Sequence, residues 1–136
     1  MERDSTGDPS LAGGGDVKKV VLAEKFAEIR EHWRPMVVGV LNGQHVKLAK
    51  FQGEFVWHHH ADEDELFLGV RGRFRVEFRT HVEEIGPGEF VIVPRGVEHR
   101  TVATEEVEVL LFEPAGTRNT GNIHHAVLTA PPYEQL

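Results

Sequence analysis

Histidine and carboxylate side chains gather in one short segment of this sequence. His58 and His60 are two residues apart in a β-forming stretch. Residues at this spacing point to the same side of a strand, with Cα atoms about 6.6 Å apart. Two imidazoles placed in this way can both reach one divalent ion at about 2.1 Å. His59 faces the opposite side, so the run of three histidines predicts two ligands.

A carboxylate ligand is expected from the acidic residues that follow. Glu65 is an odd number of residues beyond His60, which would put it on the wrong face of a continuous strand. The acidic segment 61–64 is typical of a turn that resets this phase and returns Glu65 on the neighbouring strand. Glu63 is the alternative carboxylate for the same role. A fourth ligand can come from His99, which follows a Pro-Arg-Gly turn.

The composition limits the other kinds of chemistry. The chain has 136 residues, nine histidines, no cysteine and a formal net charge of −7. Any metal must therefore be held by nitrogen and oxygen, a donor set that suits Fe(II), Mn(II), Ni(II), Cu(II) or Zn(II). The acidic charge and the scattered basic residues argue against nucleic acid as a partner. No apolar run approaches the roughly 20 residues of a membrane span, and the N-terminus has no signal-peptide core, so we expect a cytoplasmic protein.

The sequence divides into a leader, one domain and a tail. Residues 1–16 contain three consecutive glycines and no apolar periodicity, which predicts a flexible leader. Residues 17–123 are long enough for a single domain with a core. Residues 124–136 are predicted to form a C-terminal tail outside it.

One helix and many short strands must position the candidate ligands. Apolar residues at three- and four-residue intervals predict an amphipathic helix over 22–33, ending before Pro35. Asn42-Gly43 is the dipeptide that most favours a tight β-hairpin turn. So many short strands indicate an all-β sandwich or closed barrel. Strands are expected over 36–41, 45–51, 55–60, 66–70, 73–79, 82–85, 90–93, 99–103 and 107–112, with Phe74, Val76 and Phe78 facing the core.

The histidine motifs resemble those of the cupins. The segment His58-x-His60-x4-Glu65-x6-Gly72 is similar to the first cupin signature, and Gly88-x5-Pro94-x-Gly96-x2-His99 is similar to the second. The resemblance covers about residues 37–113. The helix and residues 117–122 also resemble a small single-domain group labelled mannose-6-phosphate-isomerase-like. Membership implies a double-stranded β-helix, or jelly-roll barrel, of six to eight strands, commonly paired as a homodimer.

The resemblance also implies the identity of the ligands. Carried over residue by residue, it makes His58, His60, Glu65 and His99 the ligands of one metal ion. Two departures from the family pattern, at Gly53 and Ala103, weaken assignment to a branch of the family and leave the ligand set unchanged.

Other polar and aromatic residues near the motifs are expected to have structural roles and not to bind a substrate. Lys47, Lys50 and Arg95 can in principle hold an anionic substrate, but cations in strands and turns are more often surface charges. The acidic residues 62–64 are interpreted as a solvated turn. Trp57 is interpreted as packing and not as a stacking surface for a ligand.

The expected function is metal-dependent chemistry on a small molecule. Four protein ligands leave two positions open on an octahedral ion, which permits dioxygenase-type or isomerase-type reactions. Metal-free sugar epimerases of cupin fold use a His and Tyr pair in the barrel, but the single tyrosine, Tyr133, is in the tail. No cation cluster for a sugar phosphate is evident, so oxygenase chemistry is preferred. The alternatives are a non-catalytic module that binds or senses a small ligand with a structural metal, and a barrel filled by its own phenylalanines.

Overall fold

The computed structural model describes residues 17–136, so the predicted leader lies outside the described residues. The described chain is all-β with one short N-terminal helix, as the sequence predicts. No helix among these residues is long and apolar enough to cross a membrane. The elements are α1 (Leu22–Glu28), β1 (Met36–Leu41), β2 (Gln44–Glu54), β3 (Glu65–Arg71), β4 (Phe74–Phe78), β5 (Val82–Ile85), β6 (Phe90–Val93) and β7 (His99–Pro114).

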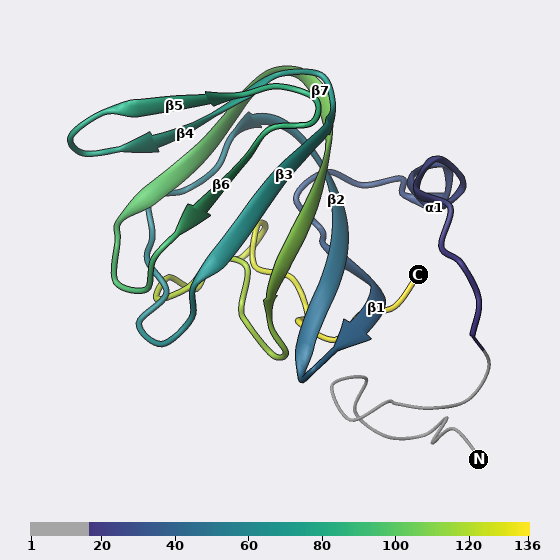
Figure 1. Ribbon diagram of the computed structural model, residues 1–136. Coiled ribbons are helices and arrows are strands. Elements are labelled where there is room, and N and C mark those ends of the chain that lie inside the picture. The colour runs from purple at the N-terminus through teal and green to yellow at the C-terminus, as the bar shows by residue number, and fades with distance from the viewer. Residues whose placement is uncertain (1–16) are drawn as a thin grey trace.

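The strands curl into a barrel because β7 takes part in two layers. Its C-terminal part lies between β2 and β3 in the antiparallel order β1-β2-β7-β3-β6. Its N-terminal part pairs with β4, which pairs in turn with β5. Figure 1 shows the β4–β5 hairpin projecting from this second layer. The enclosed core is apolar and includes Phe51, Phe67, Phe74, Val76, Ile85, Val109 and Leu111.

The two strands predicted over 99–103 and 107–112 are a single strand, β7. The ladder with β2 passes from the pair Phe51–Val107 to the pair Gly53–Ala103, which leaves residues 104–106 out of register. Gly53 has a φ of 91°, a conformation that residues with a Cβ rarely adopt. The interruption in the sequence pattern therefore corresponds to a bulge that bends one strand.

The hairpin between β1 and β2 follows the prediction. Asn42 and Gly43 have φ angles of 50° and 73°. Positive φ at both central residues is the requirement of the hairpin turn that the dipeptide favours. The turn sets the register of β2 and hence which of its residues face the barrel interior.

The helix ends earlier than predicted, so the expected span to Trp33 is wrong. Ile29 already has extended backbone angles, and Trp33 has a φ of 61°. The indole of Trp33 stacks on Phe51 and Phe55, with ring centroids 4.5 and 4.8 Å apart. A continued helix would be incompatible with this backbone, and burial of a large aromatic ring outweighs the loss of one helical turn.

The predicted tail is joined to the barrel at its C-terminal end. The backbone N–H of Val37 donates to the carbonyl of Glu134 at 2.7 Å, and that of Leu136 donates to Val37 at 3.2 Å. Arg34 donates two side-chain hydrogen bonds to the Glu134 carboxylate, at 2.6 and 2.7 Å. Leu136 also packs on the small core between α1 and the outer face of the sheet. The last residues therefore extend the edge of the sheet beside β1.

Candidate metal centre

The segment that carries the first two histidines is irregular, so the strand predicted over 55–60 is wrong. Only His58 forms a bridge with β7: its N–H donates to the His99 carbonyl at 3.0 Å, and the His99 N–H donates back at 2.9 Å. Phe55 donates to the carbonyl of Thr101. Three residues on this segment therefore span two on β7, which breaks a regular ladder. The bridge nevertheless places His58 directly opposite His99.

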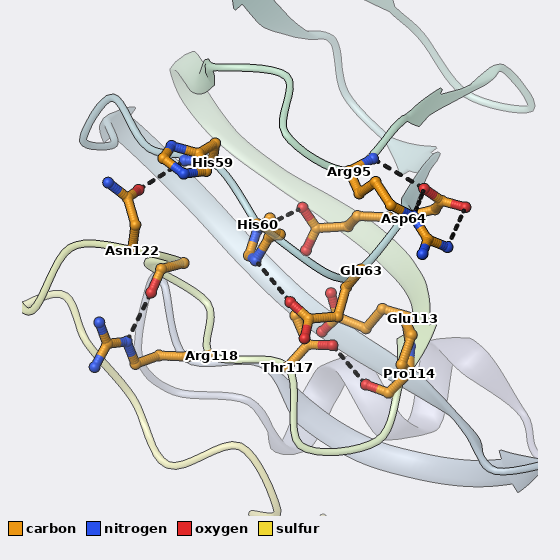
Figure 2. A network of polar contacts seen from close by, with 12 residues as sticks. His59, His60, Glu63, Asp64, Arg95, Glu113, Pro114, Thr117, Arg118 and Asn122 are labelled. Atoms are coloured by element: carbon orange, nitrogen blue, oxygen red, sulfur yellow. Dashed lines mark hydrogen bonds and ion pairs between the residues drawn. The ribbon is translucent and has the colours of Figure 1, made fainter.

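The acidic segment brings Glu65 to the interior, as predicted. Glu65 begins β3 and is 3% exposed. The preceding Asp64 accepts hydrogen bonds from the backbone N–H and the Nε of Arg95, at 2.9 and 3.2 Å (Figure 2). Gly96 donates its N–H to the His60 carbonyl at 2.7 Å. These bonds tie the two turns together, so that the ligands from both sequence motifs converge.

The four predicted ligands meet at one point. One donor atom from each of His58, His60, Glu65 and His99 lies within 4.8 Å of the others. Oε1 of Glu65 is 3.3 Å from Nε2 of His60 and 3.6 Å from Nε2 of His99. All four side chains are 3% exposed or less. A single ion placed among these atoms would be held by three imidazoles and one carboxylate.

Hydrogen bonds to backbone carbonyls orient two of the imidazoles. Nδ1 of His58 lies 2.9 Å from the Val56 carbonyl, and Nδ1 of His99 lies 2.9 Å from the Val97 carbonyl. Because a carbonyl only accepts, both Nδ1 atoms carry the proton and both Nε2 atoms keep a lone pair. Metal-bound histidines in proteins are usually oriented by such a bond at the other ring nitrogen.

Several buried donor atoms in this cluster lack a hydrogen-bond partner among the described residues. They are both ring nitrogens of His60, Oε1 of Glu65 and Nε2 of His99. A buried polar atom without a partner costs free energy, and such atoms are rare in folded proteins. Coordination of a metal ion would satisfy Nε2 of both histidines and the Glu65 oxygen at once, so the donor set fits a divalent ion.

The surroundings favour the protonation states that a metal requires at His58 and Glu65, whereas at His60 nearby carboxylates favour the protonated ring. Burial and the neighbouring His99 lower the pKa of His58 to about 4, which keeps its imidazole neutral at neutral pH. Burial opposes ionisation of Glu65, but contacts with Glu113, His60 and His99 hold its pKa well below the usual range. Burial also disfavours the charged form of His60, yet the carboxylates of Glu65 and Glu63 outweigh it and raise its pKa.

Comparison with known proteins agrees with the fold and the motifs. Residues 44–113 match the family model described as the cupin domain, which is half of the chain. The chain belongs to the cupin family. A cupin-2 domain containing protein from Shewanella frigidimarina is 39% identical, with a TM-score of 0.69 over 70% of this chain and 93% of that one. Protein NMB1881 from Neisseria meningitidis is 28% identical, with a TM-score of 0.66 over 71% and 99% of the two chains.

A curated relative is also similar to this cupin. The uncharacterized protein YdbB from Bacillus subtilis is 33% identical over 75 residues, which are 54% of this chain and 66% of YdbB. The match therefore spans slightly less than two thirds of that relative.

Two residues next to the four candidate ligands in the sequence of this cupin do not join their cluster. The backbone of His59 is bound to Asn122, and its ring contributes no atom to the cluster (Figure 2). Glu63, the alternative carboxylate, lies 3.9 Å from Nδ1 of His60, whereas Glu65 faces Nε2 of the same ring. Glu63 therefore approaches His60 from the side away from the other ligands.

The three candidate cations have different surroundings. Lys47 is 2% exposed, so its interpretation as a surface charge is wrong. Its Nζ lies 3.1 Å from Oε1 of Glu113, which is also buried and which the sequence analysis did not single out. Arg95 is exposed and paired with Asp64, and Lys50 is half-buried. Strand alternation was the available signal, since Lys47 has the parity of the buried Ala49 and Phe51 on β2.

A small cavity adjoins the ligands of the cupin. Its volume is about 20 Å³, which is room for roughly one water molecule. Aromatic side chains dominate its walls. Among them, the indole of Trp33 stacks on Phe51 and on Phe55. The lining includes Trp33, Phe51, Phe55, His58, Glu65 and Phe67.

Residues 117–122 form a strap across the end of the barrel at which β3 begins (Figure 1). Asn122 donates its N–H to the His59 carbonyl at 3.0 Å and accepts the His59 N–H on Oδ1 at 2.9 Å (Figure 2). A Cβ on Gly121 would lie 2.2 Å from the His59 carbonyl oxygen, so only glycine fits there. The strap and Trp33 thus both lie close to His58.

Proposed function

We propose that this cupin binds one divalent metal ion through His58, His60, Glu65 and His99 and acts on a small molecule at that ion. The observation that carries the proposal is the convergence of four buried donor atoms within 4.8 Å, three of which lack any hydrogen-bond partner among the described residues. A bound Fe, Mn, Ni, Cu or Zn ion would supply Lewis-acid or redox chemistry at its open positions. The protein residues supply neutral nitrogens, one negative charge and a largely dry surrounding.

Within this proposal we favour dioxygenase-type over isomerase-type chemistry. A sugar phosphate would need a cluster of free cations, but among the described residues near the site Lys47 is paired with Glu113 and Arg95 with Asp64. Tyr133 is 41% exposed and meets His45 through a ring edge, with centroids 5.6 Å apart. It contributes nothing to the lining of the cavity beside the ligands, which disfavours a His–Tyr proton-transfer pair at the centre.

Oxygen consumption tests this version of the proposal. The protein is purified without chelators, its metal content is measured, and the Fe(II) form is screened with small organic acids and phenols in an oxygen electrode. We expect consumption of dioxygen in proportion to substrate turned over, and none with His99→Ala. Equal turnover under strict anaerobiosis would exclude oxygenase chemistry and favour isomerisation.

The small cavity favours a second candidate function, a module that binds or senses a small ligand with a structural metal. A volume of about 20 Å³ admits no organic substrate without movement of Trp33 or the strap. Water proton relaxation with Mn(II) bound separates the two candidates. An exchangeable water on the ion supports catalysis, whereas a coordinatively saturated ion supports the binding module.

We also propose that the functional unit is a homodimer formed through β6. This strand ends the sheet order, and Phe90 and Ile92 on it are 60% and 53% exposed. They lie beside Leu68 and Leu66 of β3, so one face carries a continuous apolar strip. A second copy related by a two-fold axis can cover this strip with the same residues.

Sedimentation of Ile92→Glu tests the homodimer. We expect wild type to sediment as a dimer and Ile92→Glu as a monomer, because a buried unpaired charge disfavours the interface. Val82→Glu, at an exposed position on β5, is the control and should remain dimeric. A monomeric wild type at micromolar concentration contradicts the proposal.

A further inference from the structure

Two fully buried charged residues lie beside the proposed centre and are not among its ligands. Lys47 on β2 is 2% exposed and Glu113 on β7 is 1% exposed. Their charged atoms are 3.1 Å apart, and Nζ of Lys47 also donates to the Thr117 carbonyl at 3.4 Å. Ionisation of both groups at this depth would cost several kcal/mol per ion before their attraction is counted, and burial beside Glu65 raises the pKa of Glu113 well above its usual range. Apolar residues at these positions would be cheaper, so the fold alone does not explain the pair.

The strand register places Glu113 next to the one anionic ligand. Strands β3 and β7 are antiparallel, and Leu66 of β3 is opposite Phe112 of β7. One step further along this register, Glu65 and Glu113 are neighbours on the inner face. Both side chains are buried, at 3% and 1% exposure. Oε1 of Glu113 lies 3.1 Å from Nζ of Lys47, and Oε2 has no hydrogen-bond partner among the described residues.

The contacts form a chain that leads from the strap to the ligand. The Thr117 carbonyl and Glu113 hold the ammonium of Lys47, and Glu113 is the cross-strand neighbour of Glu65. Thr117 is itself anchored, because its hydroxyl donates to the Pro114 carbonyl at 2.6 Å (Figure 2). Oε1 of Glu65 faces the imidazoles of His60 and His99. Glu113, as the buried cross-strand neighbour of Glu65, therefore restrains which way this carboxylate points.

We propose that Lys47 and Glu113 are positioning residues of the metal centre, which hold the Glu65 carboxylate in the orientation that coordinates the ion. The inference rests on the proposed metal binding. Ligating carboxylates are commonly fixed by a hydrogen-bonding partner, and loss of such a partner typically lowers metal affinity by about 10- to 100-fold. The geometry of Glu65 thus depends on residues from β2, β7 and the strap.

Two substitutions of Glu113 separate contact from charge. Glu113→Gln keeps the side-chain length and can donate and accept, so we expect its Kd for Zn(II) to stay within about threefold of wild type. Glu113→Asp keeps the carboxyl group but is one methylene shorter, and we expect its affinity to fall by about 10-fold or more. The Kd is measured by competition with a chromophoric chelator, and the absorption spectrum of the Co(II) form reports ligand geometry.

A double substitution separates positioning from stability. Lys47→Met with Glu113→Leu replaces the pair by apolar side chains, which is often neutral or stabilising for a buried ion pair. We expect an unchanged or higher Tm for the apo protein together with about 10- to 100-fold weaker Zn(II) binding. The matched control is Arg34→Met with Glu134→Leu, which removes a pair that contacts no ligand and should leave the Kd unchanged.

The outcomes are distinguishable from failure of the proposed function. If wild type binds neither Zn(II) nor Co(II), metal binding itself is wrong and the inference falls with it. If wild type binds but Glu113→Asp and the double variant keep its Kd, the pair acts only in the fold. If Glu113→Asp binds normally and Glu113→Gln does not, the pair acts through charge, and positioning by contact is overturned. Should the double variant fail to fold, the two Glu113 variants decide.

Discussion

Replacement of His58 or His99 by alanine is expected to abolish stoichiometric metal binding. Each change removes one of four converging donors and leaves the remaining three with an incomplete shell. Because loss of a mere supporting contact costs about 10- to 100-fold in affinity, loss of a ligand should cost more than about 100-fold. Elemental analysis of protein purified without chelators or affinity nickel gives the stoichiometry, and chelator competition gives the Kd.

Thermal unfolding provides a second measurement of the same effect. Metal that binds only the folded state stabilises it by about 2.7 kcal/mol at a free concentration of 100 times the Kd. Wild type should therefore show a rise in Tm with added Zn(II), which both variants should lack. His59→Ala is the matched control, since its side chain contributes no donor atom and its binding should be unchanged. Stoichiometric metal in both ligand variants would refute the centre.

Replacement of Trp33 by alanine should produce the largest change in stability. Its indole is 9% exposed and stacks on Phe51 and Phe55, and the loss of a buried Trp side chain typically costs about 3–5 kcal/mol. The change would open an aromatic-lined cavity next to His58. Dry apolar cavities of this kind bind small apolar molecules, so indole should raise the Tm of Trp33→Ala and leave that of wild type unchanged.

Trp57→Ala is the control for this experiment. Its half-buried ring lies beneath the guanidinium of Arg79, which is 3.7 Å from the ring centroid. Removal of this partly exposed contact should cost about 1 kcal/mol and create no cavity. Denaturant unfolding with and without indole gives both quantities. Equal losses in the two variants, or no effect of indole on Trp33→Ala, would show that Trp33 does not fill the space beside the centre.

The two predictions concern connected parts of one site. Trp33 and Asn119 of the strap both line the cavity beside His58 and Glu65, and Asn119 joins the two segments. Its side-chain amide donates to the carbonyls of Trp33 and Leu128, at 3.2 and 2.8 Å. Any substrate larger than the present cavity must displace one of these segments before it reaches the ion.

Local spacing in the sequence, together with the resemblance to the cupin motifs, was sufficient to single out the four residues that converge in the structure and to predict much of the fold. The strand period identified His58 and His60 as a pair and excluded His59, although the segment proved irregular. The need for a turn before Glu65 followed from the same period. Asn42-Gly43 predicted its hairpin because the preference for positive φ belongs to these two residues and to no distant contact.

Long-range contacts decided the remaining features. The helix stops early because Trp33 gains more by stacking on Phe51 of β2 and on Phe55 just after it, contacts that local periodicity cannot reveal. Lys47 and Glu113 have the strand parity of inward-facing residues. A buried charge is costly in free energy unless an oppositely charged partner is near. Because the two residues are distant in sequence, local patterns could not pair them. The sequence alone thus determined which residues were candidates to bind a metal. Only the tertiary structure decided which buried charges support them and how the barrel is closed, because both depend on packing between β2, β7 and the segments that cover the barrel end.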